Sequence, residues 1–343
     1  MKQQQTRIAA LSYLRIVGTL GVILMHAAST LTDNPDLFPL SGGEQAFFRA
    51  IIRCMTWCVP CFLMVTGALL LKREKPVSIA DCVFKYARRA FLALVVFGIP
   101  FAMMIEFAST RRLSLSLIPN AIVRILSNDS FAHLWYLYML IGIYLLLPMI
   151  KAFTDNCTDE ALGYILLVLY VFNFVLPAAS ALSGIAIAFK LPAESCYLFY
   201  LLAGHYLTRR RPAWSSNAAL MLSTVALCLS ATVVACACRW DRADVVASYS
   251  SPVTALCAAA VFSLFGRLKG ETPARALALD RLTFGVYLIH PLFIHVLYRL
   301  LGITPAGSLF FIMLPVIACG VAVASFLATR ALMLIRPLRE YVL

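Results

Sequence analysis

Arg15 and His26 are the two side chains best suited to chemistry in the first long apolar run of the chain, LSYLRIVGTLGVILMHAAS. An α-helix turns by about 100° per residue, so eleven residues return them to almost the same face, roughly 16 Å apart along the axis. Ionisable groups in a membrane helix are expensive and indicate a functional site that faces the protein interior. A guanidinium can bind phosphate and an imidazole can move a proton. The pair therefore suits a long anionic cofactor whose reactive end lies far from its charge.

A second candidate site begins the run FAHLWYLYMLIGIYLLLPMI, where His133 and Trp135 are expected near a membrane surface. Tryptophan stacks on the apolar face of a sugar ring, and histidine can hydrogen-bond a hydroxyl group. This pattern predicts a polar, ring-shaped substrate. The alternative is the aromatic belt that enriches Trp and Tyr at membrane interfaces without any site.

Further ionisable residues accompany other apolar runs. His290 lies in TFGVYLIHPLFIHVL, where Pro291 would free a backbone carbonyl, and it is either a substrate-binding residue or a packed core histidine. Glu106 is an acid expected inside the third span and a candidate for substrate binding; alternatively it would pair with an arginine, orient His26 or lie in the interface.

Lys85, Arg88 and Arg89 precede the third apolar run as a basic cluster. Arginine binds phosphate in a bidentate manner and lysine binds it as a point charge, so the cluster predicts a site for the phosphates of a nucleotide-like cofactor. The excess of basic residues on the inner side of membrane proteins explains the cluster equally well.

The composition is that of an integral membrane protein. The 343 residues are 62% hydrophobic and 13% charged, with a mean hydropathy of +0.87, whereas soluble domains are about 25% charged. The net charge of +13 comes from basic residues in short loops, with no basic groove interleaved with aromatic residues, which argues against nucleic-acid binding. Cys54, Cys58 and Cys61 have no histidine or acid at ligand spacing, so we expect no metal site.

The apolar runs predict an all-α, polytopic fold in a single domain, 1–343, with about ten transmembrane helices. Basic loops such as 72–75, 85–89 and 209–211 predict that both termini are cytoplasmic. The expected spans are 8–29, 50–71, 87–107, 132–150, 161–179, 194–208, 217–238, 249–267, 282–301 and 308–335.

Together these segments resemble the acyltransferase-3 family of bacterial membrane proteins. The resemblance rests on the Arg-x10-His signature of Arg15 and His26, on VPxFxMxxGxLL at 59–70, on HLWYLYxLIxxYLLxP at 133–148 and on FGVYLIHPLFI at 284–294. Among its members the chain most resembles the small ones without a soluble domain, such as O-acetyltransferases of enterobacterial common antigen and exopolysaccharides.

The resemblance implies an acetyl-CoA-dependent O-acyltransferase in the bacterial cytoplasmic membrane, with Arg15 and His26 as its catalytic centre. An acetyl or other short acyl group would pass from cytoplasmic acyl-CoA to a hydroxyl of an envelope glycan or lipid-linked saccharide, with His26 as general base or as acyl-carrying nucleophile. Many members have an acid three residues before the signature arginine, where this chain has Ser12. Many also have a substrate- or acyl-binding arginine at the position of Thr56; here Arg53, one turn further out, is the candidate for substrate binding.

Two other classes of function remain open from the sequence. One is an exporter or flippase of a glycan or lipid-linked sugar, which needs a central cavity and gates but no base beside a cofactor site. The other is a membrane-embedded module that binds a small molecule without catalysis. Neither predicts binding of CoA.

Overall fold

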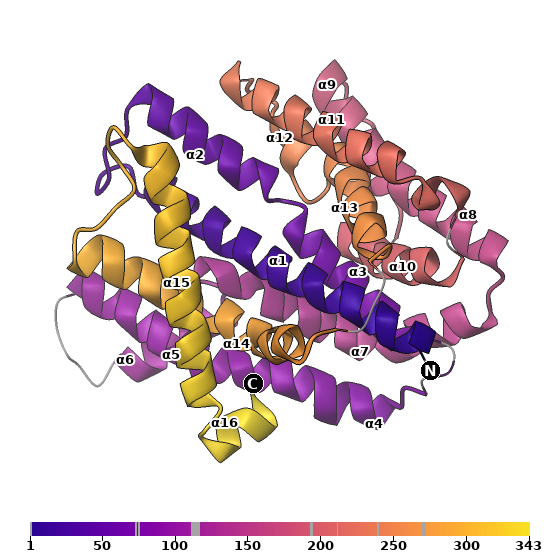
Figure 1. Cartoon of the computed structure of the whole chain (residues 1–343), viewed down its shortest axis with the longest axis horizontal. Helices are drawn as coiled ribbons and strands as arrows, with labels where there is room; N and C mark the ends of the chain where they lie inside the picture. Colours follow the sequence, from indigo (N-terminus) through magenta and orange to yellow (C-terminus); the bar gives the residue numbers. More distant parts are fainter. Residues whose placement is uncertain are drawn as a thin grey trace.

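The computed structural model describes residues 2–72, 74, 76–110, 117–192, 195–210, 212–238, 240–268 and 272–343, and for residues 2–9 and 108–110 it describes the backbone alone. Every regular element in these ranges is a helix (Figure 1). Arg73, Lys75 and Arg211 of the predicted basic loops lie outside the described residues.

Nine helical segments of the described chain are long and apolar enough to cross a membrane, so the predicted all-α polytopic fold is confirmed. Their elements are α1 (Lys2–Thr32), α2 and α3 (Gly42–Cys54, Cys58–Leu70), α4, η1 and α5 (Ile79–Asp81, Cys82–Ala87, Arg88–Thr110), η2 and α7 (Ala132–Leu134, Trp135–Asn156), α8, η3 and α9 (Asp159–Tyr170, Val171–Val175, Leu176–Ser183), α11 (Ala218–Ala237), α12 and α13 (Asp244–Ala247, Pro252–Phe265), α14 and η5 (Ala274–His295, Val296–Leu300) and α15 (Phe310–Leu332). The shorter elements are α6 (Leu117–Leu126), α10 (Cys196–Arg209), η4 (Ala213–Ser216) and α16 (Arg336–Tyr341).

The sixth predicted span, 194–208, corresponds to α10, which has 14 residues; the first of the predicted residues, 194, lies outside the described ones. At about 1.5 Å per residue α10 is shorter than a hydrocarbon core of roughly 30 Å. It packs inside the protein against α3, where a Cβ added at Gly67 or Gly204 would overlap the backbone of the other helix. The sixth predicted span is therefore a short interior helix, which protein rather than lipid surrounds.

The second span starts earlier than predicted and is broken. The capping box formed by Ser41 and Glu44 begins α2, and the chain turns at residues 55–57 before α3 starts. Pro60 explains the break, because its ring would clash with the carbonyl of residue 56 in a continuous helix. The break turns the direction of α3 relative to α2 and brings α3 against α1.

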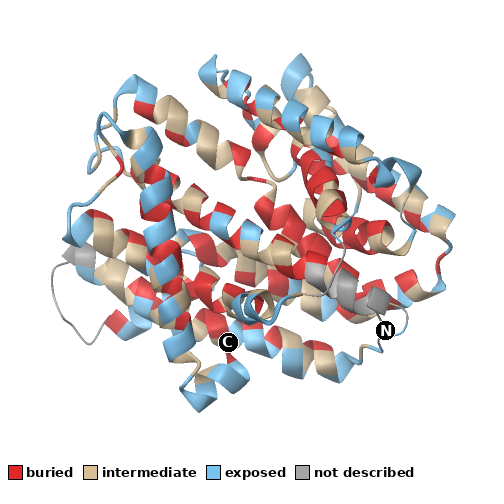
Figure 2. Cartoon of the chain, in the orientation of Figure 1, coloured by how far each residue is buried: buried red, intermediate tan, exposed pale blue. Residues whose placement is uncertain are grey.

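Helix α1 runs through the centre of the molecule, in contact with α2, α3, α14 and α15 (Figure 1). Buried residues gather in the middle of the molecule, around α1, α3 and α13, whereas exposed residues cover much of the outer faces of α11 and α15 (Figure 2). The exposed residues of α15 include Phe311, Val316, Val323 and Leu327. An apolar outer face on a helix of this length is what lipid contact requires.

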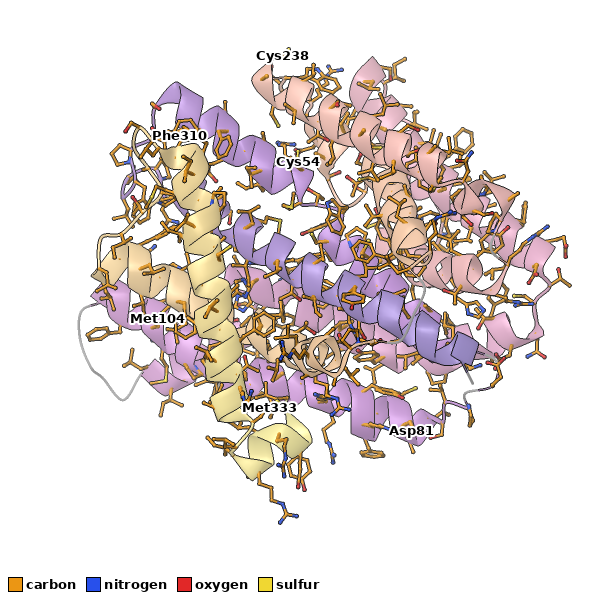
Figure 3. The ribbon with its side chains drawn as sticks, viewed as in Figure 1. Cys54, Asp81, Met104, Cys238, Phe310 and Met333 are labelled. Carbon is orange, nitrogen blue, oxygen red and sulfur yellow. The ribbon has the colours of Figure 1, made fainter. Side chains whose placement is uncertain are left out.

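The two ends of the molecule are marked by labelled side chains in Figure 3. Asp81, at the start of the η1–α5 segment, and Met333, just after α15, lie in the lower part of the view, whereas Phe310 and Cys238 lie in the upper part. Both chain ends also lie in the lower part of the same view (Figure 1). This placement agrees with the prediction that the two termini share one side.

Candidate active site

A cavity of about 570 Å³ lies beside α1, between α3, α7 and α14. It is lined by residues of five helical segments together with Tyr249 and two residues near the C-terminus: Arg15, Thr19, Val22, Met25 and His26 from α1; Val59, Phe62, Val65, Thr66, Leu69 and Leu70 from α3; Tyr86, Arg89 and Ala90; His133, Trp135, Tyr136, Leu140 and Tyr144; Asp280, Arg281, Thr283, Phe284 and Tyr287 from α14; and Met333 and Leu343. Arg15 and His26 both line this cavity, as expected for two residues on the same face of α1.

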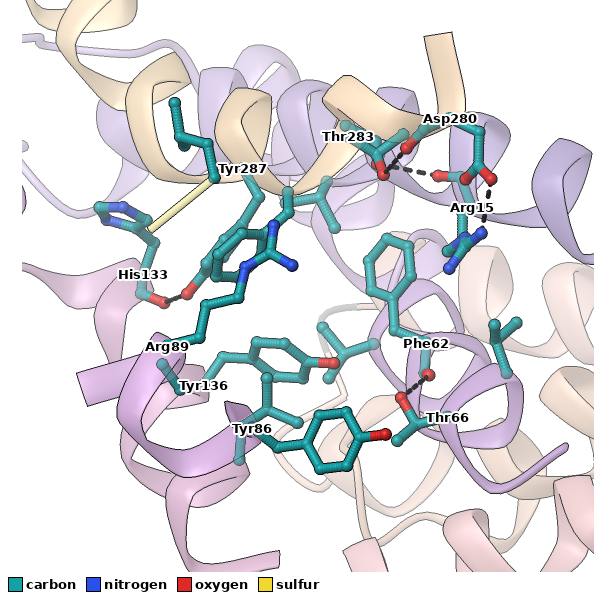
Figure 4. Close-up of a pocket in the computed structure, with 18 of the residues that line it drawn as sticks. Arg15, Phe62, Thr66, Tyr86, Arg89, His133, Tyr136, Asp280, Thr283 and Tyr287 are labelled. Atoms are coloured by element: carbon teal, nitrogen blue, oxygen red, sulfur yellow. Dashed lines mark hydrogen bonds and ion pairs between the residues drawn. The ribbon is translucent and has the colours of Figure 1, made fainter. Parts of the chain in front are cut away.

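At one end of the cavity Arg15 is held by Asp280 of α14 (Figure 4). Nη2 of Arg15 donates to Oδ2 of Asp280 at 2.5 Å, and the hydroxyl of Ser12 donates to the same oxygen at 2.8 Å. The Asp280 side chain is only 4% exposed, whereas 33% of the Arg15 side chain is exposed. The buried carboxylate thus fixes the guanidinium while part of it still faces the cavity.

Asp280 was missed by the sequence analysis, although Ser12 at the family's acid position raised the question of what pairs with Arg15. The acid comes from another helix, and Ser12 binds it rather than replacing it. One signal was present in the sequence: Asp280 precedes His290 by ten residues, nearly the spacing of Arg15 and His26.

At the other end His26 contacts His290. Nδ1 of His26 lies 2.7 Å from Nε2 of His290, and Nδ1 of His290 lies 3.1 Å from the carbonyl oxygen of Val286. His290 is fully buried, while His26 lines the cavity. The structure therefore places His290 behind His26, away from where a substrate would lie.

His133 completes a cluster of three histidines. Its ring centroid is 6.3 Å from that of His26 and 5.7 Å from that of His290. It is buried, lines the cavity and has no hydrogen-bond partner on either ring nitrogen among the described residues. The hydroxyl of Tyr287 donates to its backbone oxygen at 2.5 Å (Figure 4). His133 thus adds a third, buried imidazole to the wall of the cavity beside His26.

Trp135 belongs to an aromatic group around the cavity. Its ring centroid lies 5.3 Å from that of Tyr249 and 5.7 Å from that of Tyr197, with ring planes tilted by 39° and 36°. Tyr136 makes an edge contact with it at 6.1 Å. Trp135, Tyr136 and Tyr249 line the cavity, so their rings do more than anchor the chain at a membrane surface. Neither tyrosine was among the predicted site residues.

One member of the predicted basic cluster lies in the wall of the cavity. Arg89 lines the cavity, donates from Nε to the carbonyl of Val342 at 3.2 Å and lies over the ring of Phe284. Lys85 and Arg88 are exposed on the same segment, over the rings of Tyr86 and Tyr341 respectively.

Arg53 and Glu106, the other two predicted substrate-binding residues, lie outside this cavity. Arg53 pairs with Asp244 at 2.7 Å, and Glu106 pairs with Arg124 at 3.2 Å. For Glu106 this is the arginine pairing that the sequence analysis considered. Within the described chain no group of three or more metal-ligating side chains is placed to hold an ion.

Residues 8–330 match a protein family described as an acyltransferase domain. This match spans nearly the whole chain, and the protein belongs to that family, acyltransferase-3. It is therefore a membrane acyltransferase. Comparison with curated proteins and with solved structures gave no match.

Proposed function

We propose that this protein is an acetyl-CoA-dependent O-acyltransferase of the bacterial cytoplasmic membrane. It takes an acetyl or other short acyl group from cytoplasmic acyl-CoA and delivers it to a hydroxyl group of an envelope glycan or lipid-linked saccharide. The observation that carries the proposal is one cavity with Arg15 at one end and His26, beside His133, at the other.

The distribution of charge in the cavity supports an anionic donor. The charged lining residues are Arg15, Arg89, Asp280 and Arg281, three cations and one acid, and the acid is already bonded to Arg15. Guanidinium groups bind phosphate strongly because they offer paired donors in a plane. Lys85 and Arg88 on the exposed surface nearby would meet the remaining phosphates of CoA.

The distance between the two ends supports an extended donor. Arg15 and His26 are separated by roughly 16 Å along α1 at about 1.5 Å per residue. With its phosphates near Arg15 and Arg89, the pantetheine arm of acyl-CoA would lie along the apolar residues between them. The thioester would then reach His26.

His26 acts as the general base in this proposal. Its imidazole takes the proton of the acceptor hydroxyl as the oxygen attacks the thioester carbonyl, which forms a tetrahedral oxyanion. The oxyanion collapses, the bond to sulfur breaks, and the CoA thiolate receives the proton from His26. His133 lies beside this point, with its ring centroid 6.3 Å from that of His26.

The aromatic group supports a saccharide acceptor. Trp135, Tyr136 and Tyr249 offer ring faces, phenol hydroxyls and an indole N–H to a molecule in the cavity, which are the contacts that sugars use. None of the charged lining residues comes from these segments. The part of the acceptor that enters the cavity is therefore expected to be uncharged.

The test is titration of the purified protein in detergent with acetyl-CoA, followed by measurement of free CoA when envelope glycan is added. The proposal predicts saturable binding and acceptor-dependent release of CoA. Absence of binding at high micromolar acetyl-CoA would contradict it and favour an exporter of glycan.

A further inference from the structure

The buried histidine behind His26 has a bonding pattern that fixes where its proton lies. Nδ1 of His290 is 3.1 Å from the carbonyl oxygen of Val286. A carbonyl oxygen only accepts hydrogen bonds, so Nδ1 of His290 must carry the proton. In a neutral imidazole the other nitrogen, Nε2, is then an acceptor.

The contact with His26 follows from this assignment. Nε2 of His290, as an acceptor, lies 2.7 Å from Nδ1 of His26, so Nδ1 of His26 must donate. The neutral ring of His26 therefore has its lone pair on Nε2. Among the described residues no group bonds to that nitrogen, and His26 lines the cavity.

The two rings are arranged for a linear hydrogen bond. Their planes differ by 3° and their centroids are 5.0 Å apart. The distance between the centroids equals the 2.7 Å between the two nitrogens plus the distance from each nitrogen to the centre of its own ring. The rings thus lie edge to edge in one plane, which is the best geometry for a bond between ring nitrogens.

Helix α14 provides a polar partner for each of the two site residues of α1. Asp280 bonds Arg15 and His290 bonds His26, so the helices run in the same direction with their polar residues in register. Pro291 has no N–H, so the carbonyl of Tyr287 lacks its usual helical donor, one residue from the carbonyl that His290 binds. The carbonyl of Tyr287 is therefore an additional polar group near the fully buried ring of His290.

We propose that His290 is a positioning residue that holds His26 in the tautomer with the proton on Nδ1, so that Nε2 of His26 receives the proton of the acceptor hydroxyl. This inference rests on the proposed function and adds to it the identity of the working nitrogen. A free histidine ring favours the opposite tautomer, with the proton on Nε2. Without His290, the nitrogen that faces the cavity would usually be occupied by a proton.

A neutral imidazole partner has a consequence that a carboxylate would not have. When Nε2 of His26 takes the proton, the resulting cation is stabilised by the lone pair of His290 rather than by a negative charge. It gives the proton up readily to the departing thiolate. The reverse arrangement, a charged His290 that donates to His26, would bury a cation among Val286, Tyr287, His133 and His26 with no acid in contact among the described residues.

The test compares three substitutions by steady-state kinetics with acetyl-CoA. His290→Phe keeps an aromatic ring but removes the acceptor, and we expect kcat to fall by about 10²-fold, while KM for acetyl-CoA changes by less than about threefold. His290→Gln places an amide oxygen near the former Nε2 and should recover at least about tenfold of the loss. His295→Phe, on the same helix and outside the cavity, is the matched control and should resemble the unmodified protein.

A second readout does not depend on catalysis. Nitrogen-15 spectra of the imidazole rings, with His26 assigned by comparison with His26→Asn, should show a protonated Nδ1 and an unprotonated Nε2 in the unmodified protein. In His290→Phe the proton should move to Nε2. A proton on Nε2 of His26 in the unmodified protein, or full activity of His290→Phe, overturns the inference. If the unmodified protein did not turn over acetyl-CoA, that result would instead contradict the proposed function. The spectra would still decide the tautomer of His26.

Discussion

At the scale of single residues, the site depends on a guanidinium that is bonded on one side and open on the other. Asp280 bonds the Arg15 guanidinium and is itself bonded by Ser12, and a third of the Arg15 side chain remains exposed. Breaking a buried ion pair by removal of one partner is costly because the other charge stays buried without compensation. Asp280 therefore belongs to the site as much as Arg15 does, although it faces a protein group.

Arg15→Lys tests the role of the planar group while the charge is kept. An ammonium can bond Asp280 or a phosphate but cannot offer paired donors to both. Charge-assisted hydrogen bonds are worth about 1.5–3 kcal/mol, so the affinity for acetyl-CoA should fall by roughly 10–100-fold. Calorimetric titration measures this, and an unchanged dissociation constant would remove Arg15 from the donor site.

At the scale of helices, the cavity exists because α3 approaches α10 closely on one side and meets α1 on the other. Gly67 and Gly204 permit the first contact, since each faces the backbone of the other helix. Small residues that let backbones approach are the usual basis of helix packing in membranes. The same contact fixes the position of Phe62 and Thr66, which line the cavity.

Gly204→Ala should therefore destabilise the fold. Its added methyl group overlaps the backbone of Met64, which cannot move without shifting α3. Overpacking of this kind costs about 1–3 kcal/mol, so thermal unfolding in detergent should begin several degrees lower. Gly142→Ala on α7 is the control, because nothing lies within 4 Å of its added Cβ. Equal melting temperatures for the two variants would show that the close approach does not matter.

Features of the site that lie within a single helix could be predicted from the sequence. The common face of Arg15 and His26 follows from helix geometry, and Trp135, His133 and Arg89 line the same cavity as these two residues. Asp280 and the bond between His290 and His26 could not be predicted, because the choice of which helix packs against α1 depends on the whole fold. The short α10 was expected as a span because periodicity cannot distinguish an interior helix from a crossing one.

At the scale of the whole molecule, the two-sided mechanism requires that donor and acceptor approach from opposite membrane surfaces. The basic segments near Lys85 are assigned to the cytoplasm by loop charge, and the segment before His133 is assigned to the opposite side. Donor and acceptor would then enter from opposite sides and meet at His26. The acyl group would cross within the protein rather than through lipid.

Labelling of introduced cysteines in intact cells tests this orientation. In a background with Cys238→Ser, which removes an exposed native thiol, Asp129→Cys should react with an impermeant maleimide from outside. Glu74→Cys should react only after the cells are opened. The reverse pattern would show that the orientation is inverted and would exclude the two-sided scheme.

The central claim, that His26 transfers an acyl group from acyl-CoA, is tested most directly by acetyl transfer in isolated membranes. Membranes with matched amounts of the unmodified protein and of His26→Ala are given labelled acetyl-CoA and envelope glycan, and the label on the glycan is measured. General-base catalysis typically contributes 10²–10⁴-fold, so His26→Ala should lose about that much activity while it still binds acetyl-CoA. Transfer by His26→Ala within a few-fold of the unmodified protein would contradict the account.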